Sequence, residues 1–262
     1  MQRIPPPGEA PGPDETLDQL VGDWWIFQLK GGHRFSTDDL LTAWRASVER
    51  PNVRRSLDLG SGIGSVGLYL LGLVGREDME LVGLEAQEVS HKLAVRTVAR
   101  NGLSHRVTML HGDLRDPDAI PNHEKFELIT GSPPYMPIGK GVMSPHPQRA
   151  HCRMELRGSI FDYSEAARRW AAPGARFVFV MAARDDRTEQ GPAAAGWTVL
   201  ERMDVVFREG ETPMIAVLTC ALNEDGPHPP RRSETLTIRM KTGRMSPEYR
   251  ALRQQFGFYV DE

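Results

Sequence analysis

The sequence predicts an α/β protein built on a doubly wound, mostly parallel sheet. Three observations support this fold class. Strand-like and helix-like segments alternate from residue 56 onward, a glycine-rich loop joins the first of these strands to a helix, and acidic residues follow the next strands. Strands that alternate with helices favour parallel pairing, because a crossover helix returns the chain to the same end of the sheet. With no internal repeat visible, we expect a disordered Pro- and Gly-rich tail at 1–16 and one domain at 17–262.

The N-terminal part of this domain is predicted to contribute a hairpin and a helix. Residues 24–29 have the composition of a strand, and Gly31-Gly32 supplies a turn into a return strand that begins at His33. Ser36 and Asp39 have the spacing of a near capping box, so a helix should follow and end at Pro51-Asn52.

The core elements follow in order along the chain. We expect strands at 57–59, 80–84, 107–110, 126–130, 177–180, 198–207, 214–221 and 235–240. Helices should lie between them at 65–73 and around 89–98, with Val89, Leu93, Val95 and Val98 on the buried side of the latter, and a last helix should open at Ser246.

Composition limits the classes of function. The 32 Lys and Arg against 35 Asp and Glu give a formal net charge of -3, so any contact with nucleic acid must come from a local basic patch. The two cysteines, Cys152 and Cys220, have no metal-ligand spacing, and the histidines form no such pattern, so we predict no metal. No apolar stretch is long enough to span a membrane and no signal-peptide order is present; we expect a cytoplasmic protein.

The run from Leu57 to Gly64 joins a strand to a helix through the alternate glycines Gly60, Gly62 and Gly64, with Ser61 between the first two. Glycine lets the backbone turn tightly and approach a ligand, and such loops bind ligands at the carboxyl end of the first strand. The same run satisfies the dinucleotide pattern GxGxxG, so a purely structural turn and an NAD-binding oxidoreductase remain alternatives; no hydride-transfer pair such as Tyr-x-x-x-Lys supports the latter.

A second motif follows the fourth core strand as Ser132-Pro133-Pro134-Tyr135. Adjacent prolines fix two backbone torsions and leave carbonyl groups free to point into a pocket. The Ser132 side chain and the Pro133 carbonyl could accept the two protons of an exocyclic amino group, while Tyr135 stacks on the ring that carries it. The alternative is a proline-rich loop whose tyrosine merely packs.

Together these motifs resemble the amino-methyltransferases that act on DNA, RNA and protein glutamine. Three flanking stretches resemble, more narrowly, the bacterial tRNA-valine adenine-N6 methyltransferases: Gly32 to Leu41, Pro147 to Arg153, and Tyr249 to Tyr259. The resemblance runs from about residue 24 to the end. It implies a Rossmann-like, seven-stranded sheet of the class I type that depends on S-adenosyl-L-methionine, with an N-terminal hairpin and helix extension, and methyl transfer to adenine N6 of tRNA.

The resemblance also implies roles for acidic and neighbouring residues. Asp58 matches the acid that holds the loop and the methionine amino group, and Glu85 is placed to accept hydrogen bonds from ribose hydroxyls. Asp113, followed by Leu114, fits the acid at the adenine edge, although a lone loop aspartate is more often a cap. Thr37 is expected to line the cofactor pocket. Arg149, Arg153 and Arg157 could meet the phosphates of an RNA substrate, and a solvated charged face is an equal explanation.

The chain departs from this family at Ser132, where the family usually has asparagine. A serine hydroxyl reaches less far than an amide oxygen. Ser-Pro-Pro-Tyr is also familiar among DNA cytosine-N4 methyltransferases, so protein-glutamine and cytosine-N4 methylation stay open, as does a catalytically silent RNA-binding module. The sequence does not fix the oligomeric state.

Overall fold

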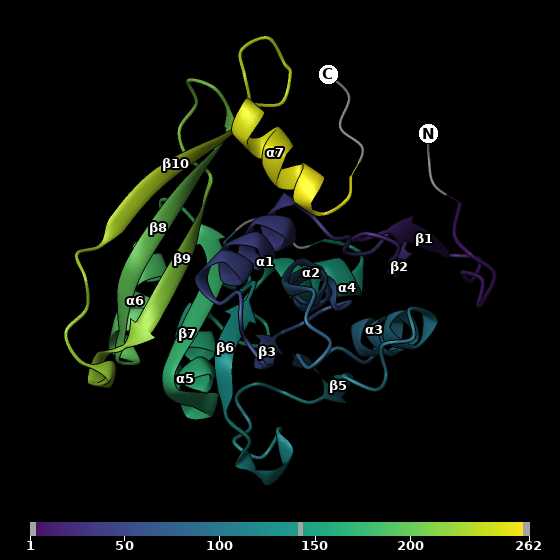
Figure 1. The fold of residues 1–262 in the computed structure, drawn as a ribbon, viewed down its shortest axis with the longest axis horizontal. Helices are drawn as coiled ribbons and strands as arrows, with labels where there is room; N and C mark the ends of the chain where they lie inside the picture. Colours follow the sequence, from purple (N-terminus) through teal and green to yellow (C-terminus); the bar gives the residue numbers. More distant parts are fainter. Residues whose placement is uncertain (1–3, 141–143, 259–262) are drawn as a thin grey trace.

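The computed structural model describes residues 4–140 and 144–258, so Tyr259, the end of the C-terminal resemblance, lies outside the described residues. In chain order the main sheet comprises β3 (Arg55–Leu59), β4 (Glu80–Glu85), β5 (Val107–His111), β6 (Phe126–Gly131), β7 (Ala171–Ala182), β8 (Trp197–Arg208), β9 (Ile215–Leu222) and β10 (Arg232–Arg239). Their order across the sheet is β10-β8-β9-β7-β6-β3-β4-β5 (Figure 1).

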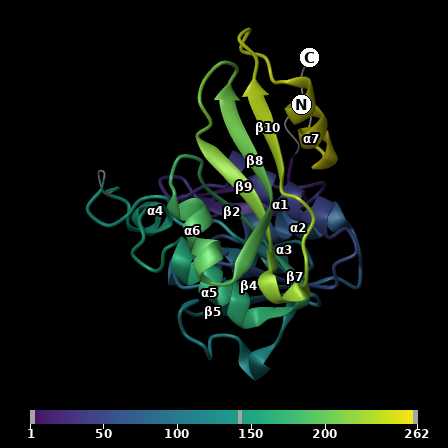
Figure 2. The same ribbon diagram turned by 90° about the vertical axis from the view of Figure 1, so that its left-hand side faces the viewer.

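The sheet is mostly parallel, which confirms the predicted fold class. The pairs β6/β3, β3/β4, β4/β5, β6/β7 and β10/β8 are parallel, whereas β9 runs antiparallel to both β7 and β8. Among the described residues the sheet has eight strands, one more than the seven that the resemblance implies, because β10 adds to the edge beside β8. This part of the sheet extends away from the helices, with α7 (Pro247–Gln255) packed beside β10 (Figure 2).

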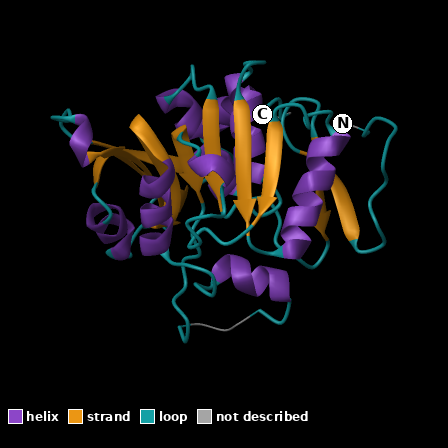
Figure 3. Cartoon of the chain, turned by 90° about the horizontal axis from the view of Figure 1, so that it is seen from below, coloured by secondary structure: helices purple, strands orange, loops and turns teal. Residues whose placement is uncertain are grey.

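Helices cover both faces of the sheet (Figure 3). One face carries α1 (Thr37–Glu49), α2 (Ser65–Val74), α3 (Glu88–Arg100) and α7; the other carries α5 (Ile160–Trp170) and α6 (Arg187–Ala194). The short helix α4 (Pro147–Arg153) contributes to the site described below, and single 3₁₀ turns occur at Pro121–His123 and Asn223–Asp225.

Two hydrophobic clusters fill the space between the helices and the sheet. Along β7, Val178 and Val180 belong to the cluster under α1 and α2, whereas Phe177 and Phe179 belong to the cluster under α5. Successive side chains of a strand point to opposite faces, so one continuous apolar run supplies both layers.

The N-terminal hairpin exists, but its partner strand differs from the prediction. β2 (Trp25–Leu29) pairs with β1 (Glu15–Gln19), which precedes it, and not with a return strand that begins at His33. The residues after β2 lead into α1 instead, and the Phe35 backbone N–H donates to the Gln28 side chain at 2.8 Å. The predicted domain boundary at residue 17 therefore falls inside β1.

Helix α1 begins at the predicted capping box. The Ser36 side chain accepts a hydrogen bond from the Asp38 backbone N–H at 3.2 Å, and the Asp39 carboxylate accepts from the Ser36 backbone N–H at 3.1 Å. These two bonds satisfy donors that a helix start leaves free. They also fix the two acidic side chains of the first turn.

The buried face of α3 was predicted only in part. Leu93 and Val98 are buried, but Val89 and Val95 are 40% and 43% exposed. The buried face instead includes Ser90, Ala94 and Thr97, because α3 packs closely against β2. Thr97 accepts a hydrogen bond from the Phe27 backbone N–H at 3.1 Å, which an apolar side chain could not do.

No helix in the described part of the chain has the length and apolar character needed to cross a membrane.

Candidate active site

The glycine-rich loop has the backbone that its sequence predicts. Gly60, Gly62 and Gly64 have φ values of +59°, +57° and +89°, a region that favours glycine. A Cβ on Gly60 would lie 2.0 Å from the Tyr163 hydroxyl oxygen, whereas a Cβ on Gly62 would meet nothing within 4 Å. The loop therefore closes against α5 at Gly60 and faces open space at Gly62.

Asp58 lies near the end of β3 and holds two neighbouring elements. Its carboxylate accepts hydrogen bonds from the Gly67 backbone N–H at 3.0 Å and from the Thr130 hydroxyl at 2.8 Å. The side chain is buried, and burial raises the pKa of Asp58 to about 6. Asp58 thus joins the start of α2 to β6 beneath the loop.

Glu85 ends β4, next to β3 in the sheet. Its two carboxylate oxygens accept the backbone N–H groups of Gly62 at 2.8 Å and of Gln87 at 2.6 Å. Burial raises the pKa of Glu85, and the Arg157 guanidinium opposes that shift. Because parallel strands end at one edge, Asp58 and Glu85 lie together at the carboxyl edge of the sheet.

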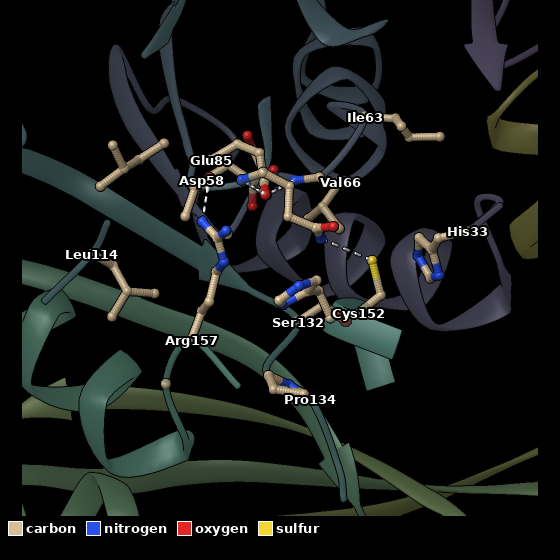
Figure 4. Close-up of a pocket in the computed structure, with 18 of the residues that line it drawn as sticks. His33, Asp58, Ile63, Val66, Glu85, Leu114, Ser132, Pro134, Cys152 and Arg157 are labelled. Carbon is tan, nitrogen blue, oxygen red and sulfur yellow. Dashed lines mark hydrogen bonds between the residues drawn. The ribbon is translucent and has the colours of Figure 1, made fainter. Parts of the chain in front are cut away.

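A cavity that is partly open to solvent lies above this edge. Its walls include the predicted residues Asp58, Gly60, Ser61, Gly62, Glu85, Leu114, Ser132, Pro134 and Arg157. Figure 4 shows Leu114 and His33 at opposite ends of this cavity, with Ser132 and Cys152 between them. We call it the cofactor cavity.

Three predicted cofactor residues are absent from its walls. Asp113 instead forms an ion pair with Arg115 at 2.6 Å, and this hydrogen-bonded contact lowers the pKa of Asp113. The Thr37 hydroxyl lies 3.4 Å from that of Tyr249 on α7, and Gly64 begins α2 behind the loop. The adenine-edge position is lined by Gly112 and Leu114, the neighbours of Asp113.

A second cavity adjoins the first and contains the rest of the Ser-Pro-Pro-Tyr motif. Pro133 and Tyr135 line it together with Asp38, Arg149 and Arg153. The Tyr135 hydroxyl donates to the Asp38 carboxylate at 2.6 Å. Burial raises the pKa of both groups, so the phenol stays protonated and donates. We call this the acceptor cavity.

The predicted basic residues divide between the two cavities. Arg149 and Arg153, on α4, line the acceptor cavity, and Arg149 donates to the Gly32 carbonyl at 3.2 Å. Arg157 lines the cofactor cavity and donates to the Ala86 carbonyl at 2.5 Å. Arg157 is therefore a neighbour of Glu85 and not a third member of one basic row.

The sequence analysis missed several residues of these walls. His33 and Asp39 precede or begin α1, Tyr163 lies on α5, and Cys152 lies on α4. The capping box explained Asp39 without reference to any ligand, the resemblance of Pro147 to Arg153 drew attention to its arginines and not to Cys152, and Tyr163 lies in a segment with no recognisable motif. Their positions follow from how α1, α4 and α5 pack over the carboxyl edge.

The cofactor cavity fits a cationic ligand that carries hydroxyl groups. Its walls contain the carboxylates of Asp39, Asp58 and Glu85 against the single guanidinium of Arg157. Glu85 faces the cavity beside Gly62, where the absent Cβ leaves room for a ligand to approach the backbone. S-adenosylmethionine carries a sulfonium, an ammonium and a ribose, which match these features. In the described residues no group of three or more His, Cys, Asp or Glu side chains could hold a metal ion.

Comparison with known proteins finds distant relatives of the chain. No protein-family model matches the chain. The chain is 26% identical over 158 residues to the tRNA1(Val) (adenine(37)-N6)-methyltransferase of Actinobacillus pleuropneumoniae serotype 5b, covering 60% of this chain and 63% of that protein. It is 25% identical over 233 residues to the protein of the same name from Pasteurella multocida, covering 85% of this chain and 89% of that protein. The first alignment thus spans less than two thirds of the relative's own length.

A solved structure shows the same fold. A protein from Agrobacterium tumefaciens, described as a predicted O-methyltransferase, superimposes with a TM-score of 0.63 at 18% identity. The superposition covers 86% of this chain and all of that chain.

The fold is that of the class I S-adenosylmethionine-dependent methyltransferases, and S-adenosylmethionine is the cofactor that it implies. Within this class the chain is a distant relative of the tRNA1(Val) adenine-N6 methyltransferases, which confirms the resemblance seen in the sequence.

Proposed function

We propose that the protein methylates the exocyclic amino group of a nucleic-acid base, and that the acceptor is adenine N6 in tRNA. One observation carries this proposal: the acceptor cavity, with Tyr135 and two arginines, meets the cofactor cavity at Ser132. The relatives, named for adenine-N6 methylation of a tRNA, support the choice of acceptor. Because tRNA is the substrate, we place the activity in the cytoplasm.

The cofactor cavity provides the binding groups for the methyl donor. Glu85 would accept hydrogen bonds from the ribose hydroxyls. The backbone of Gly60, Ser61 and Gly62 would lie against the donor, and Leu114 would cover its adenine. When bound, S-adenosylmethionine supplies an electrophilic methyl group on its sulfonium. Asp58 supports the loop through its bond to Gly67 and adds negative charge at the same end.

The acceptor cavity would hold the flipped base. An exocyclic amine is a poor nucleophile because its lone pair is delocalised into the ring. The Pro133 carbonyl and an acceptor on the Ser132 side of the amine would each accept a hydrogen bond from one N–H group, while the Tyr135 ring stacks on the base. The hydrogen bond from Tyr135 to Asp38 fixes the rotation of that ring before the base arrives. Arg149 and Arg153 would neutralise the flanking phosphates.

Methyl transfer from labelled S-adenosylmethionine to bulk tRNA, ribosomal RNA, DNA and bacterial protein, followed by nucleoside and amino-acid mass analysis, tests the proposal. We expect N6-methyladenosine in the tRNA fraction. Label in DNA cytosine or in protein glutamine would refute the acceptor, and cofactor binding without any transfer would refute the activity.

Variants of Tyr135 test the geometry of the acceptor cavity. Tyr135→Ala removes the stacking ring and should reduce turnover by at least tenfold, given that base stacking is worth about 1–3 kcal/mol. Tyr135→Phe keeps the ring and removes only the hydroxyl bonded to Asp38, so its loss should be smaller. Calorimetry with S-adenosylhomocysteine should show unchanged affinity in both variants.

A further inference from the structure

The two cavities meet at a small set of side chains. His33, Asp39, Ser132 and Cys152 line both the cofactor cavity and the acceptor cavity. Side chains at this junction can reach the acceptor nitrogen on the side from which the methyl group arrives. The proposed reaction leaves a surplus proton on that nitrogen, so one junction residue is placed to receive it.

Three of the four residues are poorly suited to accept a proton. Burial raises the pKa of the Cys152 thiol to about 12, so the thiol is protonated. Burial, together with the charges of Arg153 and Arg149, lowers the pKa of His33 to about 4, which makes its imidazole a weak base. Ser132 is a hydroxyl and a shorter acceptor than the asparagine usual in the related proteins.

Asp39 has the geometry that the other three lack. Its side chain is 4% exposed, and both of its hydrogen bonds fall on one oxygen, Oδ2, from the Ser36 backbone N–H at 3.1 Å and the Ser65 hydroxyl at 2.9 Å. Within the described ranges the structure records no donor to Oδ1. The carboxylate is therefore held in place by one oxygen and keeps the other for a ligand.

The surroundings of Asp39 tune it for proton transfer near neutral pH. Burial raises the pKa of Asp39 to about 7, and the nearby carboxylates of Asp38 and Asp58 contribute in the same direction. The other titratable groups that its charge reaches are Tyr69 on α2, Tyr135 after β6 and Cys152 on α4, all of which stay neutral because their pKa values are raised. His33 also lines the junction, and no cation bonds to Asp39 among the described residues.

We propose that Asp39 is a catalytic residue of the methyl transfer, which accepts an N–H of the acceptor amino group on its free oxygen and takes the proton that the nitrogen releases. This inference rests on the proposed function. It also explains how the chain works with Ser132, because Asp39 supplies an acceptor that the shorter serine side chain leaves missing.

The proposed transfer of the methyl group and the proton conserves atoms and electrons. The nitrogen lone pair forms the new N–C bond as the carbon–sulfur bond of the donor breaks and its electron pair stays on sulfur. One N–H bond then breaks, its electron pair returns to nitrogen, and the proton joins Oδ1 of Asp39. The proton later leaves to solvent, so the carboxylate is restored and the product amine is neutral.

The test uses Asp39→Asn, since asparagine retains a carbonyl oxygen for Ser36 and Ser65 but cannot take a proton. Asp162→Asn is the matched control, because Asp162 closes the same type of capping box at Ser159 on α5 and lines neither cavity. Single-turnover rates are measured from pH 5.5 to 8.5 with labelled S-adenosylmethionine, bulk bacterial tRNA and excess enzyme. Calorimetry with S-adenosylhomocysteine reports the cofactor site independently of activity.

We expect Asp39→Asn to lower the rate by about 100-fold, the lower end of the range for a general base. The wild-type rate should rise about tenfold per pH unit below pH 7 and then level off. The variant should lose this rise and Asp162→Asn should keep it. S-adenosylhomocysteine, which lacks the sulfonium charge, should still bind both variants, with a change in affinity far smaller than the change in rate. Ser132→Asn should partly rescue Asp39→Asn, because the longer amide restores an acceptor.

Two results would overturn the inference while the proposed function stands. One is a variant rate that follows the wild-type pH profile. The other is lost S-adenosylhomocysteine affinity with a normal rate at saturating cofactor, which would make Asp39 a cofactor ligand. If Asp39→Asn does not fold, a wild-type single-turnover rate that stays constant between pH 6 and 8 would also refute the inference. Wild-type protein that binds S-adenosylhomocysteine but labels no acceptor would instead refute the proposed function.

Discussion

Replacing Asp39 by asparagine should also change how the stability of the ligand-free protein depends on pH. Asp39 is buried and its pKa is raised from the ordinary 3.8 to about 7, so the folded state binds a proton more tightly than the unfolded chain does. The stability that this proton contributes is fully present below pH 3.8 and is lost as the pH rises through about 7.

The size of the effect follows from the two pKa values. Each unit of difference corresponds to 1.36 kcal/mol, so the free energy of unfolding is reduced by about 2 kcal/mol at pH 5 and by about 4 kcal/mol at pH 8. The wild-type protein should therefore lose about 2–3 kcal/mol through Asp39 between these pH values, an order-of-magnitude figure. Asp39→Asn removes this ionisation, so its free energy of unfolding should fall by that much less between pH 5 and pH 8.

Urea unfolding of both proteins at pH 5 and pH 8, without cofactor, measures this difference. The corresponding shift in the midpoint of thermal unfolding is about 5–10 °C for a chain of this size. A variant whose stability falls with pH as steeply as that of the wild type would refute the reasoning, because it would show that Asp39 is not a buried group with a raised pKa. Asp162→Asn should follow the wild type.

Three other substitutions test the glycine-rich loop and the buried ion pair that Arg45 on α1 forms with Glu201 on β8. Gly60→Ala should weaken S-adenosylhomocysteine binding at least tenfold in calorimetry and lower the melting temperature, because its Cβ would lie 2.0 Å from the Tyr163 hydroxyl. Gly62→Ala meets no neighbour, so its stability should fall by only about 1 kcal/mol of backbone strain; equal melting temperatures for both variants would contradict this difference. Glu201→Gln should destabilise the protein by about 3 kcal/mol in urea unfolding, because it weakens the contact that neutralises the buried Arg45 guanidinium. A loss below 1 kcal/mol would mean that this ion pair is effectively solvated.

The fold was predictable where local signals and packing agree. The strands from β3 to β9 are largely apolar runs bounded by turns, and the capping box at Ser36 depends only on two residues three positions apart. The pairing of β1 was missed because Glu15–Gln19 carries acidic residues and little apolar pattern. The Arg96 guanidinium on α3, about 80 residues later, forms an ion pair with Glu15 at 2.7 Å, and no local rule contains that contact.

The candidate site shows the same division between local and long-range information. Asp58, Glu85 and Ser132 were predictable because each lies at the end of a strand or directly after it, and strand ends meet at one edge. Asp113 has the right sequence position, but its neighbour Arg115 competes for the carboxylate. Asp39 had a sufficient local explanation as a cap, so only the packing of α1 over the sheet reveals that it faces both cavities.

The anchorage of the hairpin has a consequence for how this chain can be shortened. β2 is tied to α3 through Trp25 and Asn101 at 2.8 Å and through Phe27 and Thr97, and the Arg96 guanidinium lies 4.3 Å from the centre of the Phe27 ring. The segment from His33 to Asp39 leaves directly from this anchored strand. A truncated version that begins after residue 30 would keep every motif of the sheet, yet it would release the backbone that aims His33 and Asp39 at the junction. During synthesis the same dependence means that these side chains reach their places only after residue 101 has left the ribosome.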